Sequence, residues 1–236
     1  MLQGDCLKPY YKHEGIVIYH GDCREILPTL GKVDLVLTDP PYGIGADQNK
    51  RANTQYGNAI AQSKDYGEGN WDFEPPSKDV MDLILKSGAS QIVWGGNFFE
   101  FPASSCWLVW DKDNGDNGYA DCELAYTNLK KAVRKIKYRW MGMLQEQMGS
   151  LKEERFHPTQ KPVAVMKWCI LQAPETVQTI LDPFMGSGTT LRAAKDLNKQ
   201  AIGIEVEERY CEIAAKRLSQ EVFNFLPPSD NERKKV

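Results

Sequence analysis

The stretch VDLVLTDPPYGIG, residues 33–45, runs a nearly continuous apolar segment directly into an acid, two prolines and a tyrosine. Residues 33–38 predict a β-strand, and the nearly continuous apolar run is typical of a strand covered on both faces, as in a parallel sheet. The sequence Asp39-Pro40-Pro41 ends the strand, because proline donates no backbone hydrogen bond and fixes its own φ. Open α/β sheets bind ligands at the carboxyl ends of their strands, so this turn is expected to face a site.

Strand-length apolar segments recur along the chain and alternate with helix-like stretches. We predict strands over 16–20, 33–38, 91–95, 106–110, 122–127, 179–181 and 201–205. We predict helices over 23–30, 77–88, 162–173, 189–199 and 207–222. This alternation indicates an α/β fold with a mostly parallel, doubly wound sheet. The short polar connection between 106–110 and 122–127 predicts an antiparallel pair at one edge of that sheet.

Composition is ordinary for a soluble globular protein, and the cysteine usage predicts a reducing cytoplasm. It has 236 residues, 42% of them hydrophobic and 26% charged, with a net charge of −3. No apolar run approaches the roughly 20 residues that span a bilayer, and the first residues lack the apolar core of a signal peptide. The six cysteines are scattered without a CxxC pair, which favours neither a zinc site nor a disulfide framework. We expect one domain over 1–226 and a disordered tail over 227–236.

Two internal segments depart from this regular pattern. Residues 43–76 are rich in Gly, Asn and Gln, and such a long loop predicts a functional lid or a disordered segment. Residues 129–141 carry six basic side chains and no acid: Lys130, Lys131, Arg134, Lys135, Lys137 and Arg139. This run predicts either a phosphate-binding patch or a solvated edge strand protected by lysines.

A second motif, TILDPFMGSGTT at 179–190, repeats the order of strand, Asp-Pro and turn. Gly186 and Gly188 would let a ligand approach the backbone at a helix N-terminus. The segment matches neither a P-loop, which needs a lysine where Thr189 stands, nor a GxGxxG fingerprint. Glu205 ends a predicted strand about 20 residues later, at the offset where an acid binds ribose hydroxyls. Together these features predict a nucleoside site, to which Asp22 at another strand end could contribute.

With DPPY at 39–42 and DPFMGSG at 182–188, the chain resembles the S-adenosylmethionine-dependent DNA amino-methyltransferases. The motif order, with DPPY first, is similar to that of the circularly permuted β group of that family. HGDC at 20–23 resembles the adenine-contacting strand end, and HPTQKP at 157–162 the segment before the glycine motif. The resemblance implies a seven-stranded Rossmann-like methyltransferase sheet, with a small target-recognition insertion over 128–157.

The resemblance also implies a role for each matching residue. The target base would be held by Asp39, Pro40 and Tyr42. The cofactor loop would be formed by Asp182, Pro183, Phe184, Gly186, Ser187, Gly188 and Thr189. The other cofactor contacts would be Glu205 at the ribose, Asp22 and Cys23 at the adenine end, Thr159 and Lys161 at the carboxylate end, and Asp39. Double-stranded DNA is the implied partner, contacted by the basic residues of 130–139, and the family resemblance is compatible with a homodimer.

The implied reaction explains the opening motif. The exocyclic amino group of adenine is a poor nucleophile because its lone pair is delocalised into the ring. Asp39 and the carbonyl of Pro40 would accept its two hydrogens, leaving direct in-line transfer from the sulfonium. The base must first be flipped out of the duplex, and Tyr42 would stack on it, a contact worth roughly 1–3 kcal/mol. Aromatic residues Tyr56, Tyr66 and Trp71 in the 43–76 loop would close over the base or serve only for packing.

Several alternatives share parts of this pattern. Cytosine-C5 methylation is excluded because it needs a cysteine presented after a proline, and the chain has no Pro-Cys pair. Cytosine-N4 methylation uses the same chemistry; in the family a first-position Asp favours adenine and Ser favours cytosine. An RNA or protein-glutamine methyltransferase could share the fold, although the glutamine enzymes carry NPPY. A non-catalytic DNA-binding module with the same fold is the alternative from another class.

His157 is expected to order the HPTQKP turn.

Overall fold

The computed structural model describes residues 8–44, 74–115, 120–141, 144–149, 152–156 and 159–219. Most of the loop expected at 43–76, with Tyr56, Tyr66 and Trp71, lies outside the described residues. The same holds for His157 and for the tail expected at 227–236. Within the described part of the chain, no helix has the length and apolar character needed to cross a membrane.

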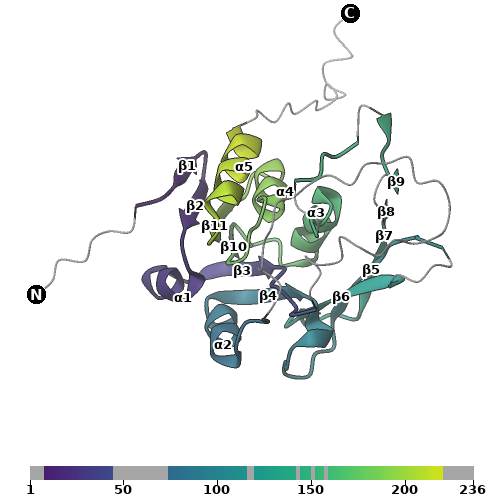
Figure 1. The fold of residues 1–236 in the computed structure, drawn as a ribbon. Helices are drawn as coiled ribbons and strands as arrows, with labels where there is room; N and C mark the ends of the chain where they lie inside the picture. The colour runs from purple at the N-terminus through teal and green to yellow at the C-terminus, as the bar shows by residue number, and fades with distance from the viewer. Residues whose placement is uncertain are drawn as a thin grey trace, which may run out of the picture.

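One nine-stranded sheet organises the molecule (Figure 1), in the order β1-β2-β11-β10-β3-β4-β6-β5-β7. Its strands are β1 (Tyr11–His13), β2 (Ile16–His20), β3 (Val33–Thr38), β4 (Gly88–Trp94), β5 (Trp107–Asp111), β6 (Cys122–Thr127), β7 (Arg134–Lys137), β10 (Thr179–Asp182) and β11 (Gln200–Glu205). Strands β2, β11, β10, β3 and β4 are all parallel. Strand β6 is antiparallel to both β4 and β5, and β7 is parallel to β5. Strands β8 (Trp140–Met141) and β9 (Leu144–Gln145) form a separate antiparallel pair.

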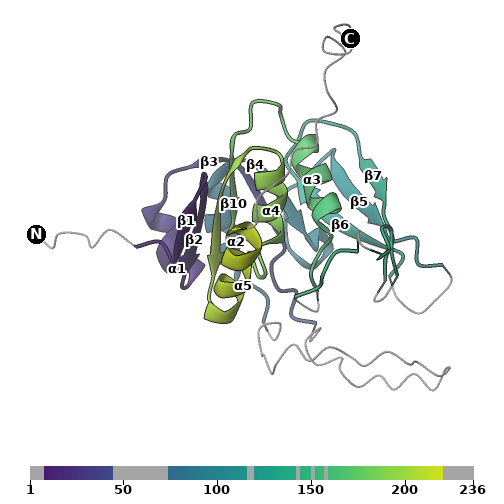
Figure 2. The ribbon, with the colours of Figure 1, turned by 90° about the horizontal axis from the view of Figure 1, so that it is seen from above.

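Helices cover both faces of the sheet (Figures 1 and 2), as expected for a doubly wound fold. One face carries α1 (Cys23–Ile26), which continues into a 3-10 turn at Leu27–Thr29, and α2 (Lys78–Lys86). The other face carries α3 (Val163–Gln172), α4 (Thr189–Asp196) and α5 (Glu208–Ser219). A further 3-10 turn, Gly96–Phe98, follows β4. Two separate hydrophobic clusters result, because alternate residues of a strand point to opposite faces.

The consecutive apolar residues Leu35, Val36 and Leu37 of β3 serve both faces of the sheet. Val36 packs with Ile84 of α2 in one cluster, whereas Leu35 and Leu37 lie with Met166 of α3 in the other. All of these side chains are almost completely buried. A strand with one solvated face could not use apolar residues at consecutive positions in this way.

All seven predicted strands and all five predicted helices are present, with ends shifted by a few residues. The sheet has two further strands, β1 and β7, which pair along its two sides. The predicted antiparallel pair β5–β6 is correct, but its position at the edge is wrong, because β7 pairs with β5 outside it. The basic run therefore supplies an edge strand, one of the two alternatives considered above.

Candidate active site

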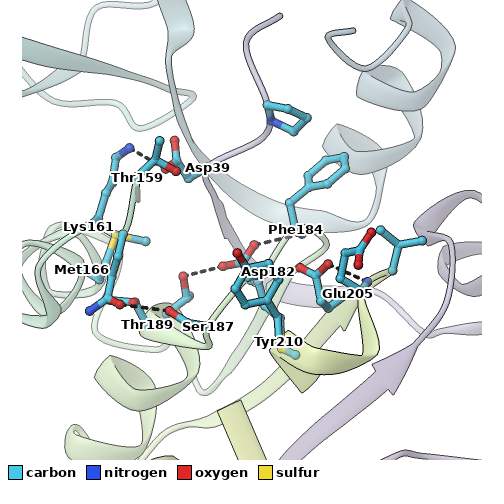
Figure 3. A pocket seen from close by; sticks show the side chains of 17 residues that line it. Asp39, Thr159, Lys161, Met166, Asp182, Phe184, Ser187, Thr189, Glu205 and Tyr210 are labelled. Carbon is cyan, nitrogen blue, oxygen red and sulfur yellow. Dashed lines mark hydrogen bonds and ion pairs between the residues drawn. The ribbon is translucent and has the colours of Figure 1, made fainter. Parts of the chain in front are cut away.

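Two adjoining cavities lie where the parallel strands end. The first has a volume of about 400 Å³ and the second about 360 Å³, and both are lined by Pro41, Phe184, Glu205 and Val206. The first is also lined by Asp39, Thr159, Gln160, Lys161, Met166, Asp182, Met185, Gly186, Ser187, Thr189, Thr190, Glu207 and Tyr210. Figure 3 shows Asp39 with Lys161 at one side of this cavity, Glu205 at the other and Asp182 between them.

Asp182 ends β10 beside the end of β3, because Leu181 pairs with Val36 in the parallel register. Its buried carboxylate accepts hydrogen bonds from Thr38 Oγ1 at 2.7 Å, Thr190 Oγ1 at 2.5 Å and the backbone N–H of Phe184 at 3.1 Å. Burial raises the pKa of Asp182 to about 6, against the effect of these donors. The carboxylate therefore fixes the start of the glycine loop to two neighbouring elements.

The glycine loop turns from β10 into α4. Gly186 and Gly188 have φ values of +50° and +79°, which other residues rarely adopt. A Cβ on Gly188 would also lie 2.8 Å from Cβ of Ala214 in α5, so glycine permits this close helix contact. Gly186 lines the first cavity, whereas Gly188 does not, and the ligand contacts predicted for this loop stay predictions.

Glu205 lies at the junction of the two cavities. One of its carboxylate oxygens accepts from Gly186 N at 2.9 Å and the other from Glu207 N at 2.9 Å. Burial nevertheless raises the pKa of Glu205 to about 7. This carboxylate is thus held between the glycine loop and the end of β11, with lone pairs left for a ligand's hydroxyl groups.

Asp39 begins the turn after β3 and meets a lysine from a distant part of the chain. Lys161 Nζ lies 2.6 Å from Asp39 Oδ2 and 3.0 Å from Glu123 Oε2. The other Asp39 oxygen accepts a short hydrogen bond from the Tyr42 hydroxyl. Burial raises the pKa of Asp39, and the Lys161 ammonium opposes part of this increase.

Tyr42 lies in the same turn, and its ring packs against the rings of Phe98 and Phe99. Its ring lies 4.8 Å from that of Phe98 with an interplanar angle of 14°, and it meets Phe99 edge-on at 6.3 Å. Gly95, with φ +68°, lies against the Tyr42 ring, because a Cβ there would be 2.1 Å from Cε1 of Tyr42. This cluster of aromatic rings is therefore formed by Tyr42 of the DPPY motif and by residues that follow β4.

Asp22 and Cys23 lie where the sequence places them, at the end of β2, and both line the second cavity with Pro183. Asp22 caps α1 by accepting from Arg24 N at 2.8 Å, and its side chain also pairs with the Arg24 guanidinium. This hydrogen bonding lowers the pKa of Asp22. The predicted cofactor residues therefore divide between the two cavities: Thr159, Lys161 and the glycine loop in the first, Asp22 and Cys23 in the second.

Several cavity residues escaped the sequence analysis. Gln160 is buried and connects three segments: its Oε1 accepts from Phe156 N at 2.8 Å and Ser187 Oγ at 3.2 Å, and its Nε2 donates to Glu153 at 3.0 Å. Gln160 lies within the HPTQKP motif between two predicted site residues, so its position in the sequence could have identified it as a site residue. Val206 directly follows Glu205, lines both cavities and is 62% exposed.

The six basic residues do not gather at the cavities. Lys130 and Lys131 precede β7, and Lys131 donates to the carbonyl of Gln172 at the far end of α3. Because β7 runs parallel to β5, its last residue Lys137, and Arg139 just after the strand, lie toward the edge where the cavities open. Both pair with Asp113, and Lys135 pairs with Asp111 at 3.2 Å.

Comparisons with known proteins agree with this geometry. A family model described as DNA methylase matches residues 112–216. The type II methyltransferase M2.DpnII of Streptococcus pneumoniae is 30% identical over 258 residues, covering 91% of this chain and 93% of that protein. The crystal structure of the M1.HpyAVI–SAM complex has a TM-score of 0.53 and 25% identity, covering 86% of this chain and 99% of that one.

The fold is also that of PvuII DNA methyltransferase, described as cytosine-N4-specific, with a TM-score of 0.57 at 16% identity over 96% of this chain and 93% of that one. Two Asp-Pro strand ends meet at one cavity, a glycine loop leads into a helix beside it, and the M2.DpnII relation extends over nearly the whole sequence. The chain belongs to the DNA methylase family, which includes type II methyltransferases.

Proposed function

We propose that this protein is a site-specific DNA methyltransferase that methylates the 6-amino group of adenine, and that it belongs to the circularly permuted β group. The observation that carries the proposal is the place of Asp39, the first residue of DPPY, whose carboxylate lines the same cavity as the glycine loop. An aspartate in this position favours adenine over cytosine in the family. The type II relatives indicate a place in restriction–modification.

Its cofactor is S-adenosylmethionine, and the two adjoining cavities fit that elongated molecule. Glu205 at their junction would accept hydrogen bonds from the ribose hydroxyls, since its lone pairs are not exhausted by two backbone donors. Asp22 and Cys23 would hold the adenine end in the second cavity, and Thr159 the methionine end in the first. When bound, S-adenosylmethionine supplies a methyl group on a positively charged sulfonium.

The chain's own residues would prepare the target base. Each carboxylate oxygen of Asp39 has a second lone pair beyond its contact with Lys161 or Tyr42, so it can still accept a hydrogen from an amino group. The carbonyl of Pro40 would accept the other hydrogen, in a direction fixed by the proline ring. The Tyr42 ring would stack on the flipped-out base. The homodimer and the cytoplasmic location expected from the sequence stay predictions.

The test is methyl transfer from labelled S-adenosylmethionine to mixed-sequence duplex DNA, followed by digestion to nucleosides and mass spectrometry. We expect label in 6-methyladenine, and none in a parallel sample with Asp39→Ala. Label in 4-methylcytosine would overturn the adenine assignment and leave amino methylation standing. If the protein bound the cofactor but left no label in any base, DNA would not be its substrate. An RNA substrate or a non-catalytic binding module would then be favoured.

Cofactor binding is expected to tighten with rising pH. The pKa of Glu205 is about 7 in the free protein, and ribose hydroxyls donating to it would stabilise the ionised form, so binding releases a proton. We expect the dissociation constant to be roughly tenfold higher at pH 6 than at pH 8. Calorimetry in two buffers of different ionisation enthalpy measures both the affinity and the proton release.

S-adenosylhomocysteine is the matched ligand for this measurement, because it keeps the ribose and lacks the sulfonium charge. It should show the same pH dependence if Glu205 is the titrating group. An affinity that stays constant from pH 6 to 8 would contradict the predicted ribose contact.

DNA binding is expected to depend on the later part of the basic run. Lys137 ends β7 toward the cavities, and the Lys135 side chain reaches Asp111 at the same end of β5. DNA phosphates would replace their present partners Asp113 and Asp111. Replacing both lysines by alanine should reduce the slope of log affinity against log salt by up to about 2, since each lost phosphate contact changes it by about 0.9. Titration of fluorescent duplex DNA at several salt concentrations measures this slope.

The control comes from the same run: Lys130→Ala with Lys131→Ala removes equal charge at the opposite end of β7 and should leave the slope unchanged. Equal effects of the two double variants would mean that the protein's total charge, rather than this surface, determines the salt dependence.

A further inference from the structure

Four side chains of alternating charge lead from the rim of the sheet to Asp39. Lys112 Nζ lies 2.6 Å from Glu123 Oε1, and Glu123 Oε2 lies 3.0 Å from Lys161 Nζ. Lys161 Nζ in turn lies 2.6 Å from Asp39 Oδ2. We call these four residues the charge row. Lys161 is its most buried member, with 6% of its side chain exposed.

The charge row joins parts of the chain that are far apart in sequence. Asp39 follows β3, Lys161 precedes α3, Lys112 follows β5, and Glu123 lies in β6. Strand β6 runs antiparallel to its neighbours, so its first residues lie at the edge where the parallel strands end. That direction brings Glu123 to the site from a strand start rather than a strand end.

Aromatic rings enclose the central ammonium of the row. Lys161 Nζ lies 5.2 Å from the ring centre of Trp94 and 5.8 Å from that of Tyr42. It also lies 3.3 Å from the Tyr42 hydroxyl oxygen. In this desolvated setting, charges interact more strongly than in water, so the number of carboxylates that share the ammonium matters.

Lys161 is shared between two carboxylates, and this sharing limits how strongly it neutralises either one. Burial alone would raise the pKa of Glu123, but the Lys161 and Lys112 ammonium groups lower it to about 2, so Glu123 is ionised. Burial would lower the pKa of Lys161, yet Asp39 and Glu123 hold it well above its ordinary value. The titratable groups that face Asp39 in the described residues are Tyr42, Lys161, Glu123 and Asp182.

We propose that Glu123, acting through Lys161, is a positioning residue for Asp39. It draws the ammonium partly away from Asp39, so that the Asp39 carboxylate is less neutralised and is a more basic, stronger acceptor for the target amino group. This rests on the proposed function, in which Asp39 accepts a hydrogen from that amino group. Glu123 does not line either described cavity, so its effect on the reaction is indirect.

The first test measures the ionisation of Asp39 without the reaction. Carboxyl-labelled aspartate gives a carbon NMR titration, and the Asp39 signal is assigned by its loss in Asp39→Asn. Glu123→Gln removes a negative neighbour and should lower the Asp39 midpoint by about one pH unit. Lys112→Gln removes a positive neighbour of Glu123, so Glu123 is less neutralised. The Asp39 midpoint should then rise, by a smaller amount. An unmoved midpoint in a folded Glu123→Gln protein would overturn the proposal.

The second test follows kcat against pH. The acid limb of the profile should move to lower pH in Glu123→Gln and to higher pH in Lys112→Gln, whereas loss of packing would move both variants alike. Glu212→Gln, which breaks an exposed ion pair with Lys216 on α5, is the matched control and should change neither measurement. If the acid limb moved in the same direction in Glu123→Gln and Lys112→Gln, the proposal would be overturned.

The two proposals fail separately. Loss of methyl transfer in Asp39→Asn, with an acid limb that Glu123→Gln does not move, would overturn only the role of Glu123. Wild-type methyl transfer by Asp39→Asn would overturn the role of Asp39 and, with it, the role of its positioning residue.

Discussion

Replacing Asp39 by asparagine is expected to reduce methyl transfer by about 10³-fold, the largest effect that a single substitution should have here. Asparagine keeps the size of the side chain but turns one acceptor oxygen into a donor and removes the charge. It also removes the anion that pairs with the Lys161 ammonium at 2.6 Å. Single-turnover transfer of labelled methyl groups to duplex DNA, with saturating cofactor, measures the chemical step.

Asp82→Asn is the matched control, because Asp82 lies on α2 and pairs only with the exposed Lys78 among the interactions described. It should react at the wild-type rate. The Asp39→Asn protein should still bind S-adenosylmethionine within about tenfold of wild type, since Glu205 and the glycine loop are intact. A rate for Asp39→Asn within tenfold of wild type would show that the DPPY aspartate is not the acceptor of the target amino group.

The second large effect is expected from Gly95→Ala. The added Cβ would lie 2.1 Å from Cε1 of Tyr42, so the tyrosine ring must move. A displacement of about 1 Å in a group that positions the substrate costs about 10²-fold in rate, and we expect a loss of that size in methyl transfer. Cofactor affinity should change little, because neither residue lines the two cavities described.

The chain offers a close control for the backbone cost of this substitution. Gly115 has φ +69°, nearly the +68° of Gly95, but a Cβ there meets nothing within 4 Å. Gly115→Ala should therefore cost about 1–2 kcal/mol of stability, seen in thermal unfolding, with methyl transfer nearly unchanged. Equal losses of activity in the two variants would mean that backbone strain, and not the position of Tyr42, explains the effect.

The central fold was predictable because its strands are apolar at consecutive positions. Residues 33–38 and 179–181 could not be amphipathic strands, and both lie in the parallel part of the sheet. Strand β1 was missed, and β7 was only one of two alternatives for the basic run, because Tyr11–His13 and Arg134–Lys137 carry mainly polar side chains. Their extended conformation comes from pairing with β2 and β5, a tertiary effect that local sequence does not contain.

The candidate site was predictable where its residues end parallel strands. Asp39, Asp182 and Glu205 follow or close such strands, and the cavity brings them together. Glu123 could not be found by this rule, because it lies at the start of an antiparallel strand. Phe98 was missed for a different reason: it lies in a 3-10 turn, and only the fold brings its ring against Tyr42.

The first cavity is lined from the turn after β3 and from β10, β11, α3, α4 and α5, so a bound ligand joins elements that must separate when the protein unfolds. Ligand that binds only the folded chain at 100 times its dissociation constant stabilises it by about 2.7 kcal/mol. For a chain of this size, that corresponds to a rise of about 5–10 °C in melting temperature. Cofactor analogues and inhibitors can therefore be ranked by thermal shift alone, before the DNA sequence that the protein recognises is known.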